Sequence, residues 1–205
     1  GRFDEALETI DQTIAMKKEI YGTEDHPSVA EALEVKGKIY DHQGEFEKEE
    51  KIWERVLEIQ RKSYSEDHPI LATTHYNYAS LFLRRGEYDK AAEHLQLSLE
   101  ITEKSLGGKT NADYFGRLVR LATCRYEQQA YSEAQKVLEQ AGDLQHDIFG
   151  ESPHPFVARM LRLQSEVQRR LGRFDDALDF FWQTPRISCL DIIDILILFL
   201  NCADA

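Results

Sequence analysis

The sequence predicts an all-α protein built as a right-handed solenoid of antiparallel helix pairs. A glycine–x–aromatic motif recurs with its aromatic residue at positions 3, 46, 88 and 174, and a weaker copy at 131 fills the remaining slot. The repeat period is therefore 42–43 residues. The composition is rich in Glu, Ala, Leu, Lys and Gln, which favour helices, and no segment requires a strand. A fixed period of this length indicates a repeat architecture, in which units bury their apolar faces against their neighbours.

A second motif runs in phase with the first. Glu-Asp-His-Pro occurs at residues 24–27 and 66–69, and a related Pro-His-Pro occurs at 153–155. An acid beside a histidine can be half of a catalytic or metal site, but a copy in successive repeats favours a helix start. Pro69 is expected at the first helical position, where its missing N–H costs nothing. Asp67 is expected to cap that helix and to interact with its dipole.

The unit at residues 69–107 illustrates how each repeat is expected to fold. Gly86 ends the first helix, the second begins after Glu87, and the two glycines at 107–108 stop it. The apolar positions with helical spacing are Ala72, His75, Tyr78, Ala79 and Phe82 in the first helix and Tyr88, Ala91, Leu95, Leu99 and Ile101 in the second. We expect His75 to be packed and hydrogen-bonded, and His94 and His146 to be solvated.

The repeat pattern divides the chain into a solenoid at 1–184 and an apolar tail at 185–205. The chain starts inside a unit, as expected for a segment of a longer solenoid. The solenoid comprises an orphan second helix at 1–22 and repeats at about 26–65, 68–107, 110–149 and 154–184.

The motif Gly-x-aromatic-x-x-Ala, seen at Gly86–Ala91, resembles that of the tetratricopeptide repeat (TPR). The period, the His-Pro helix starts and the ending Leu99–Gly107 are similar to the kinesin-light-chain subtype. The resemblance covers residues 1–184 and implies a protein–protein interaction scaffold. In that subtype, asparagines of the first helix face a peptide groove. Only Asn77 matches here, and its equivalents in the other units are Val35, Arg120 and Leu163.

Composition excludes several function classes. The net charge of −12 argues against a nucleic-acid partner, since phosphate binding needs clustered cations. The three cysteines have no metal-ligand spacing, and their odd number favours a reduced, cytoplasmic compartment. Cys124 is expected to be a small buried residue. No phosphate-binding loop or metal-ligand cluster is present in the sequence, so we expect neither enzymatic activity nor a cofactor.

The first helix of each pair is expected to line the concave face of the solenoid and to bind a peptide or a partner helix. Its polar stripe runs from acidic in the first unit (Glu31, Glu34, Lys38, Asp41) to strongly basic in the last. The predicted partner-binding residues are Thr73, Tyr76, Asn77, Ser80, Arg84, Arg120, Thr123, Arg159, Arg162 and Arg169. A gradient of charge would orient a bound peptide. The alternative is that these stripes are simply solvated or covered by neighbouring repeats.

The tail does not follow the repeat pattern. Between Ile187 and Leu200 only Ser188, Asp191 and Asp194 are polar, and the run is short for a bilayer core. We favour a helix packed on the last repeat. The alternatives are an interface for self-association and an end that a shifted reading frame or an alternative exon adds to the repeats. A membrane segment is disfavoured. The alternative function for the whole chain is accordingly a structural or oligomerisation segment, or a regulatory sensor array of a larger protein.

Overall fold

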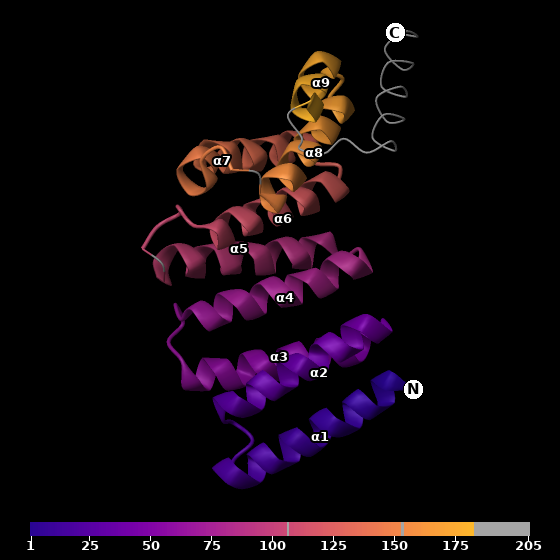
Figure 1. Ribbon diagram of the computed structural model, residues 1–205, viewed down its shortest axis with the longest axis vertical. Coiled ribbons are helices and arrows are strands. Elements are labelled where there is room, and N and C mark those ends of the chain that lie inside the picture. Colours follow the sequence, from indigo (N-terminus) through magenta and orange to yellow (C-terminus); the bar gives the residue numbers. More distant parts are fainter. Residues whose placement is uncertain (106, 153, 183–205) are drawn as a thin grey trace. The chain divides into compact units, whose positions relative to one another are not determined.

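A computed structural model describes residues 1–105, 107–152 and 154–182, and within these ranges the chain is all helical, as predicted (Figure 1). The helices are α1 (Arg2–Tyr21), α2 (Pro27–Gln43), α3 (Phe46–Ser63), α4 (Pro69–Arg85), α5 (Tyr88–Ser105), α6 (Ala112–Glu127), α7 (Tyr131–Phe149), α8 (Pro155–Arg170) and α9 (Phe174–Trp182). The tail at 185–205, with the alternatives proposed for it, lies outside the described residues.

The chain divides into two compact units, Gly1–Gly108 and Lys109–Ala205. In the first unit each helix from α1 to α5 packs on the next one along the chain. In the second unit α6 packs on α7, α7 on α8 and α8 on α9, and α6 also contacts α8. Each unit is thus a stack of helices in sequence order.

Each unit has its own apolar core. Trp53 and Val56 of α3 are at most 2% exposed, and Leu81 of α4 is fully buried. In the second unit the fully buried Phe115 of α6 and the nearly buried Leu138 of α7 have the same role. The core positions predicted for the unit at 69–107 are all buried except Tyr88, which is half-buried, so the periodicity of the sequence explains most of what these two helices bury.

Histidine, and not aspartate, caps the helices that begin with proline. The Nδ1 atoms of His26, His68 and His154 accept hydrogen bonds from the backbone N–H two residues on, at 3.1, 3.3 and 3.2 Å. The prediction that Asp67 caps α4 is wrong. A ring nitrogen in the neutral imidazole is an acceptor in the same position that a Ser or Asp oxygen usually occupies.

The aspartates of these motifs instead reach the second helix of the pair. Asp25 forms ion pairs with Arg55 at 2.7 Å and Lys62 at 2.8 Å in α3. Asp67 lies 3.3 Å from Lys104 in the last turn of α5. In these two loops the acid therefore pairs with a cation near the C-terminal end of the following α3 or α5, where positive charge also suits the helix dipole.

Aromatic rings hold the capping histidines in place. Tyr21 stacks on His26 with ring centroids 3.5 Å apart, Tyr64 on His68 at 4.3 Å, and Phe149 on His154 at 4.2 Å. Each aromatic residue belongs to the end of the preceding helix or directly follows it. The stack and the cap together fix the turn from one repeat to the next.

His75 is buried as predicted, but the prediction that His94 is solvated is wrong. The Nδ1 atoms of His75 and His94 lie 2.8 Å apart in a hydrogen bond between α4 and α5. The His94 ring also packs against Tyr78 and Phe82, with centroids 4.5 and 5.4 Å away. Desolvation lowers the pKa of both imidazoles to about 4, helped at His75 by His94 and at both by Arg61.

The described helices were also compared with what a membrane-spanning helix requires. No helix within the described ranges combines the length and the hydropathy that a membrane crossing requires. His146 is exposed, as predicted.

Candidate peptide-binding surface

The predicted partner-binding residues of the first unit lie along one face of α4. Thr73 is exposed, whereas Tyr76, Asn77 and Ser80 are half-buried. The hydroxyls of Thr73 and Ser80 donate to carbonyls of their own helix, at 3.4 and 3.2 Å. The Asn77 side chain forms no hydrogen bond with the part of the chain that the structure describes. Asn77 is therefore the α4 side chain whose amide is available to a ligand backbone.

Arg84, at the end of the same face, is tied to the core of its own unit. Its guanidinium donates to both carboxylate oxygens of Glu49, at 2.8 and 2.7 Å, and lies 3.1 Å from Asp41. Glu49 is only 2% exposed and also accepts a bond from Trp53 Nε1 at 3.0 Å. Removing one partner of such a buried pair leaves an uncompensated charge.

Sequence reasoning missed Glu49. The signal that could have found it is its position four residues before Trp53, on the buried face of the same helix. The stripe position of Arg84 predicts ligand binding, and the structure gives this residue a second role as the counter-ion of Glu49.

The acidic stripe of α2 is partly compensated within the unit. Glu34 accepts a hydrogen bond from Gln60 at 2.9 Å, and burial raises the pKa of its carboxyl. Glu31 lies 3.5 Å from Lys17, and Asp41 pairs with Arg84. The negative charge predicted for this face is thus reduced by neighbouring cations of the same unit.

On α6 the predicted residues are only partly accessible. Arg120 and Thr123 are half-buried, and the Thr123 hydroxyl donates to the Val119 carbonyl at 2.9 Å. A Cβ at Gly116 would lie 3.1 Å from the Phe156 ring, so α8 approaches α6 closely at this position. Glycine permits this approach because it has no side chain.

On α8 the arginines fall into two classes. The guanidinium of Arg169 binds the Glu166 carboxylate, and its Nε lies 2.9 Å from the second oxygen. Tyr126 donates to the same carboxylate at 2.7 Å, and Arg170 lies 3.4 Å away. The hydrogen bond from Arg169, joined by that from Tyr126, lowers the pKa of Glu166 to about 2. The predicted site residue Arg169 is therefore neutralised by a partner on its own helix.

Arg159 and Arg162 form the second class. Both are exposed and lie one turn apart on α8, and neither has an ion pair or hydrogen bond with the described residues. They are followed on the same face by Glu166 and its arginine partners. Either guanidinium can bind a carboxylate through two parallel hydrogen bonds.

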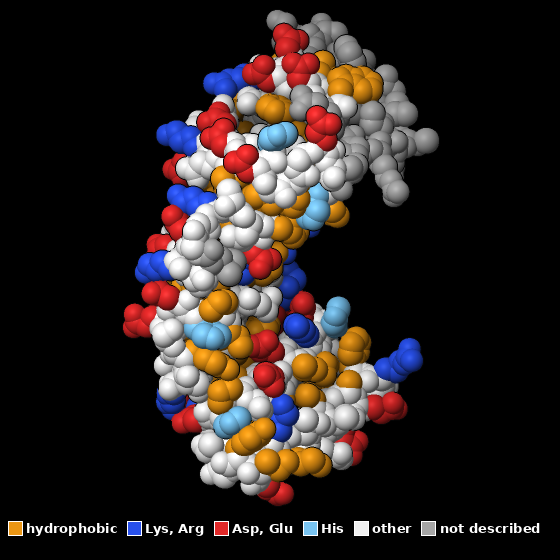
Figure 2. All heavy atoms as spheres, turned by 60° about the vertical axis from the view of Figure 1, so that its left-hand side comes forward, with side chains coloured by type: hydrophobic (Ala, Val, Ile, Leu, Met, Phe, Trp, Pro, Cys, Tyr) orange, Lys and Arg blue, Asp and Glu red, His pale blue; other side chains and the backbone are white. Residues whose placement is uncertain are grey.

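Charges elsewhere on the surface alternate in sign. On the face presented in Figure 2, acidic and basic side chains lie next to one another rather than in separate patches. Within the described residues, many charged side chains belong to ion pairs such as Arg85 with Glu50 and Lys90 with Glu87. Uncompensated cations such as Arg159 and Arg162 therefore stand out as binding candidates.

Nucleophile and metal chemistry has no support in the described part of the chain. Cys124 is fully buried, as expected, and burial raises the pKa of its thiol to about 12. A thiol in that environment is protonated and unreactive at neutral pH. No cluster of three or more potential metal ligands occurs among the described residues.

Comparison with family models identifies the fold. A model described as the MalT-like TPR region matches residues 1–191, nearly the whole chain. The chain belongs to this TPR family. The resemblance inferred from the repeat motifs is thereby confirmed.

Solved structures agree with this assignment. BtubC (BKLC) from P. vanneervenii has a TM-score of 0.80 at 19% identity, over 92% of this chain and 79% of its own. A putative kinesin light chain from Podospora anserina has a TM-score of 0.76 at 21% identity, over 90% and 86%. YrrB, described as a TPR protein with an unusual peptide-binding site, has a TM-score of 0.59 at 13% identity, over 100% and 84%. A search of curated proteins found no match. These identities establish the TPR fold alone.

Proposed function

We propose that this TPR array is a non-catalytic protein–protein interaction scaffold, in which the exposed face of the first helix of a repeat, α8 above all, binds a peptide or a partner helix. The observation that carries the proposal is the pair Arg159 and Arg162, which are exposed and unpaired within the described chain. Neighbouring arginines of α8 are neutralised by Glu166, and Arg84 is neutralised by Glu49. Unpaired arginines on one helix face suit an acidic side chain or a terminal carboxylate.

Two further features support the same function. Tyr76 and Asn77 provide an aromatic ring and an amide on α4, and an asparagine amide can both donate to and accept from a peptide backbone. YrrB, with the same fold, carries a peptide-binding site by its description. A binding scaffold for proteins, and not nucleic acid, also fits the net charge of −12.

The test is selection of a random peptide library on the purified chain and on the variant Arg159→Glu/Arg162→Glu. The expected result is enrichment of peptides with an acidic end, lost in the variant. The matched control is Lys51→Glu/Lys136→Glu, which changes the net charge equally at two exposed lysines of α3 and α7. The control should retain the enrichment, since it alters the global field but not α8.

Two results would contradict the proposal. Equal loss in both variants would mean that only overall charge matters. Absence of enrichment with the unmodified chain would favour the structural alternative, in which association depends on the apolar run 187–200. Sedimentation over a dilution series, with and without charged substitutions in that run, would then decide whether the chain self-associates.

A further inference from the structure

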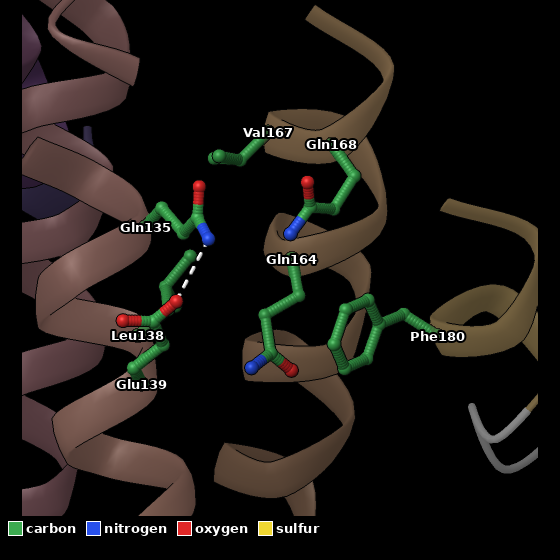
Figure 3. A pocket seen from close by; sticks show the side chains of 7 residues that line it. All are labelled: Gln135, Leu138, Glu139, Gln164, Val167, Gln168 and Phe180. Carbon is green, nitrogen blue, oxygen red and sulfur yellow. Dashed lines mark hydrogen bonds between the residues drawn. The ribbon is translucent and has the colours of Figure 1, made fainter. Parts of the chain in front are cut away.

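A hollow in the second unit lies where another repeat has a filled core. It is bordered by α7, α8 and α9, and the empty space between them is about 250 Å³ when the part open to solvent is counted. The interior itself has room for only a few water molecules. Figure 3 shows the side chains of α7 and α8 facing one another across it, with Phe180 reaching in from α9. The lining residues are Gln135, Leu138, Glu139, Gln164, Val167, Gln168 and Phe180.

The repeat register explains why this hollow exists. Counting from Pro69 and Pro155, Gln164 and Gln168 of α8 occupy the positions that Tyr78 and Phe82 have in α4. In the first unit these two rings stack on one another, with centroids 4.7 Å apart, and both contact His94. Substitution of two rings by slender amides leaves space that the unit does not refill, because protein interiors collapse only partly around a missing side chain.

The chemistry of the hollow is that of an incomplete hydrogen-bonding site. Gln164 and Gln168 are 9% and 7% exposed, and the Oε1 atom of each is buried and has no hydrogen-bond partner among the described residues. Buried acceptors of this kind are normally satisfied, since an unsatisfied one costs about 1–3 kcal/mol. The terminal torsion of glutamine is broad, so rotation can turn either amide toward an incoming donor.

The rim adds polarity but little net charge. Gln135 donates to Glu139 at 2.7 Å and accepts from Arg173 at 3.1 Å, so an acid and a base flank the opening. Leu138 and Val167 line the hollow with aliphatic groups, and Phe180 offers a ring surface. This combination suits a planar group rich in N–H donors, which can stack on an aromatic ring while it donates to amide oxygens.

We propose that the hollow between α7, α8 and α9 is a ligand pocket for one peptide side chain that ends in a planar N–H donor group, a carboxamide or a guanidinium. Gln164 and Gln168 accept its hydrogen bonds, and Phe180 packs on its face. The pocket lies on the buried face of α8, opposite exposed Arg159 and Arg162. The two binding sites can therefore be present or absent independently.

The test uses the full chain and three blocked tripeptides, acetyl-Ala-X-Ala-amide, in which X is Arg, Gln or Leu. Binding is followed by NMR through the side-chain amide signals of Gln164 and Gln168. The expected result is saturable shifts with the Arg or Gln peptide, or both, at affinities about tenfold above that of the Leu peptide, since one good hydrogen bond is worth about a factor of ten. The Arg and Gln arms distinguish guanidinium from carboxamide.

Variants assign the response to the pocket. Gln164→Leu/Gln168→Leu roughly keeps the side-chain volume but removes the amide acceptors. Gln164→Tyr/Gln168→Phe introduces the aromatic pair that the first unit has at these positions. Both variants should abolish the peptide-induced shifts, which are followed in them through the NMR signals of Phe180. Gln140→Leu, at an exposed position of α7, is the matched control and should bind normally. Gln164→Met/Gln168→Met, which keeps the side-chain length and removes both amide acceptors, provides the same test if the leucine variant does not fold.

Three outcomes would overturn the proposal: equal shifts with all three peptides, no shifts with any of them, or unchanged binding in the filled variant. Equal shifts would mean that binding does not depend on a side-chain donor, and the absence of shifts would mean that water or the chain itself already satisfies the two amides. None of these outcomes bears on library selection at Arg159 and Arg162, so failure here is distinguishable from failure of the proposed function.

Discussion

At the scale of single residues, the buried pair His75 and His94 is a departure from the repeat. In the other repeats the position of His75 is Leu33, Leu118 or Leu161, and that of His94 is an apolar residue. The two imidazoles satisfy one another through a 2.8 Å hydrogen bond, so they fit a core that elsewhere is aliphatic. The polar pair His75 and His94 thus replaces an apolar pair, and either imidazole alone would lose its hydrogen-bond partner in the core.

This pair should make stability depend on pH. Both folded-state pKa values are about 4, below the ordinary 6.5, so the unfolded chain binds more protons in that window. The free energy of unfolding should therefore fall as pH falls from 6.5 to 4. Binding of one proton by the histidine pair accounts for a loss on the order of 3 kcal/mol.

The variant His75→Leu/His94→Val, which restores the residue types of other repeats, should remove this dependence and leave stability at pH 7 unchanged or higher. Urea unfolding at a series of pH values measures the difference from the unmodified chain, which cancels the carboxylates common to both. His146→Gln, at an exposed site, is the control. Parallel pH profiles for the double variant and the unmodified chain would show that the pair does not titrate in this window.

At the scale of elements, the His-Pro motif shows what sequence could and could not provide. Helical period, with Pro or Gly at many of the helix ends, predicted an all-helical chain, because burial of one face and the stereochemistry of helix ends are local properties. The residue that caps α4 was harder to predict, because Asp67 and His68 can both accept a hydrogen bond from the first turn. In the structure His68 caps α4 and stacks on Tyr64, while Asp67 pairs with Lys104. His154 caps α8 in the same way, although no aspartate precedes it.

The cap predicts a specific ranking of variants at His68. His68→Ala should lower the free energy of unfolding by about 1–2 kcal/mol, because α4 loses its acceptor and Tyr64 its stacking partner. His68→Asn should retain most of the stability, since asparagine is among the best N-cap residues. Urea denaturation measures both, with exposed His146→Ala as the control. Equal losses for Ala and Asn would mean that the ring, and not the hydrogen bond, stabilises the turn.

The residue types alone do not predict the pocket, for a related reason. Gln164 and Gln168 are ordinary surface residues by type, and only alignment with Tyr78 and Phe82 of another repeat reveals that they occupy core positions. The same holds for Glu49, whose burial depends on Arg84 from a different helix pair. Sequence predicts which positions are internal, whereas partners from other helices decide what an internal polar residue does.

At the scale of the whole molecule, the repeat architecture separates local from global effects. Contacts within each unit are largely between helices consecutive in sequence, so each helix pair depends mainly on its neighbours. Stability of such an array is approximately a sum of repeat and interface contributions. A ligand or a mutation in one repeat is then expected to influence adjacent repeats more than distant ones.

Amide hydrogen exchange of two matched core variants tests this expectation. Leu138→Ala in α7 removes a side chain that is 1% exposed and should cost about 2–5 kcal/mol. Its protection loss should be concentrated in α6, α7 and α8 and small in α2. The reciprocal variant is Val56→Ala, which shortens a fully buried side chain of α3. It should reduce the protection of backbone amides in α2, α3 and α4, while those of α8 remain protected. A uniform loss along the chain in either variant would mean that the array unfolds as one cooperative body, and binding at Arg159 and Arg162 would then be sensitive to substitutions in any repeat.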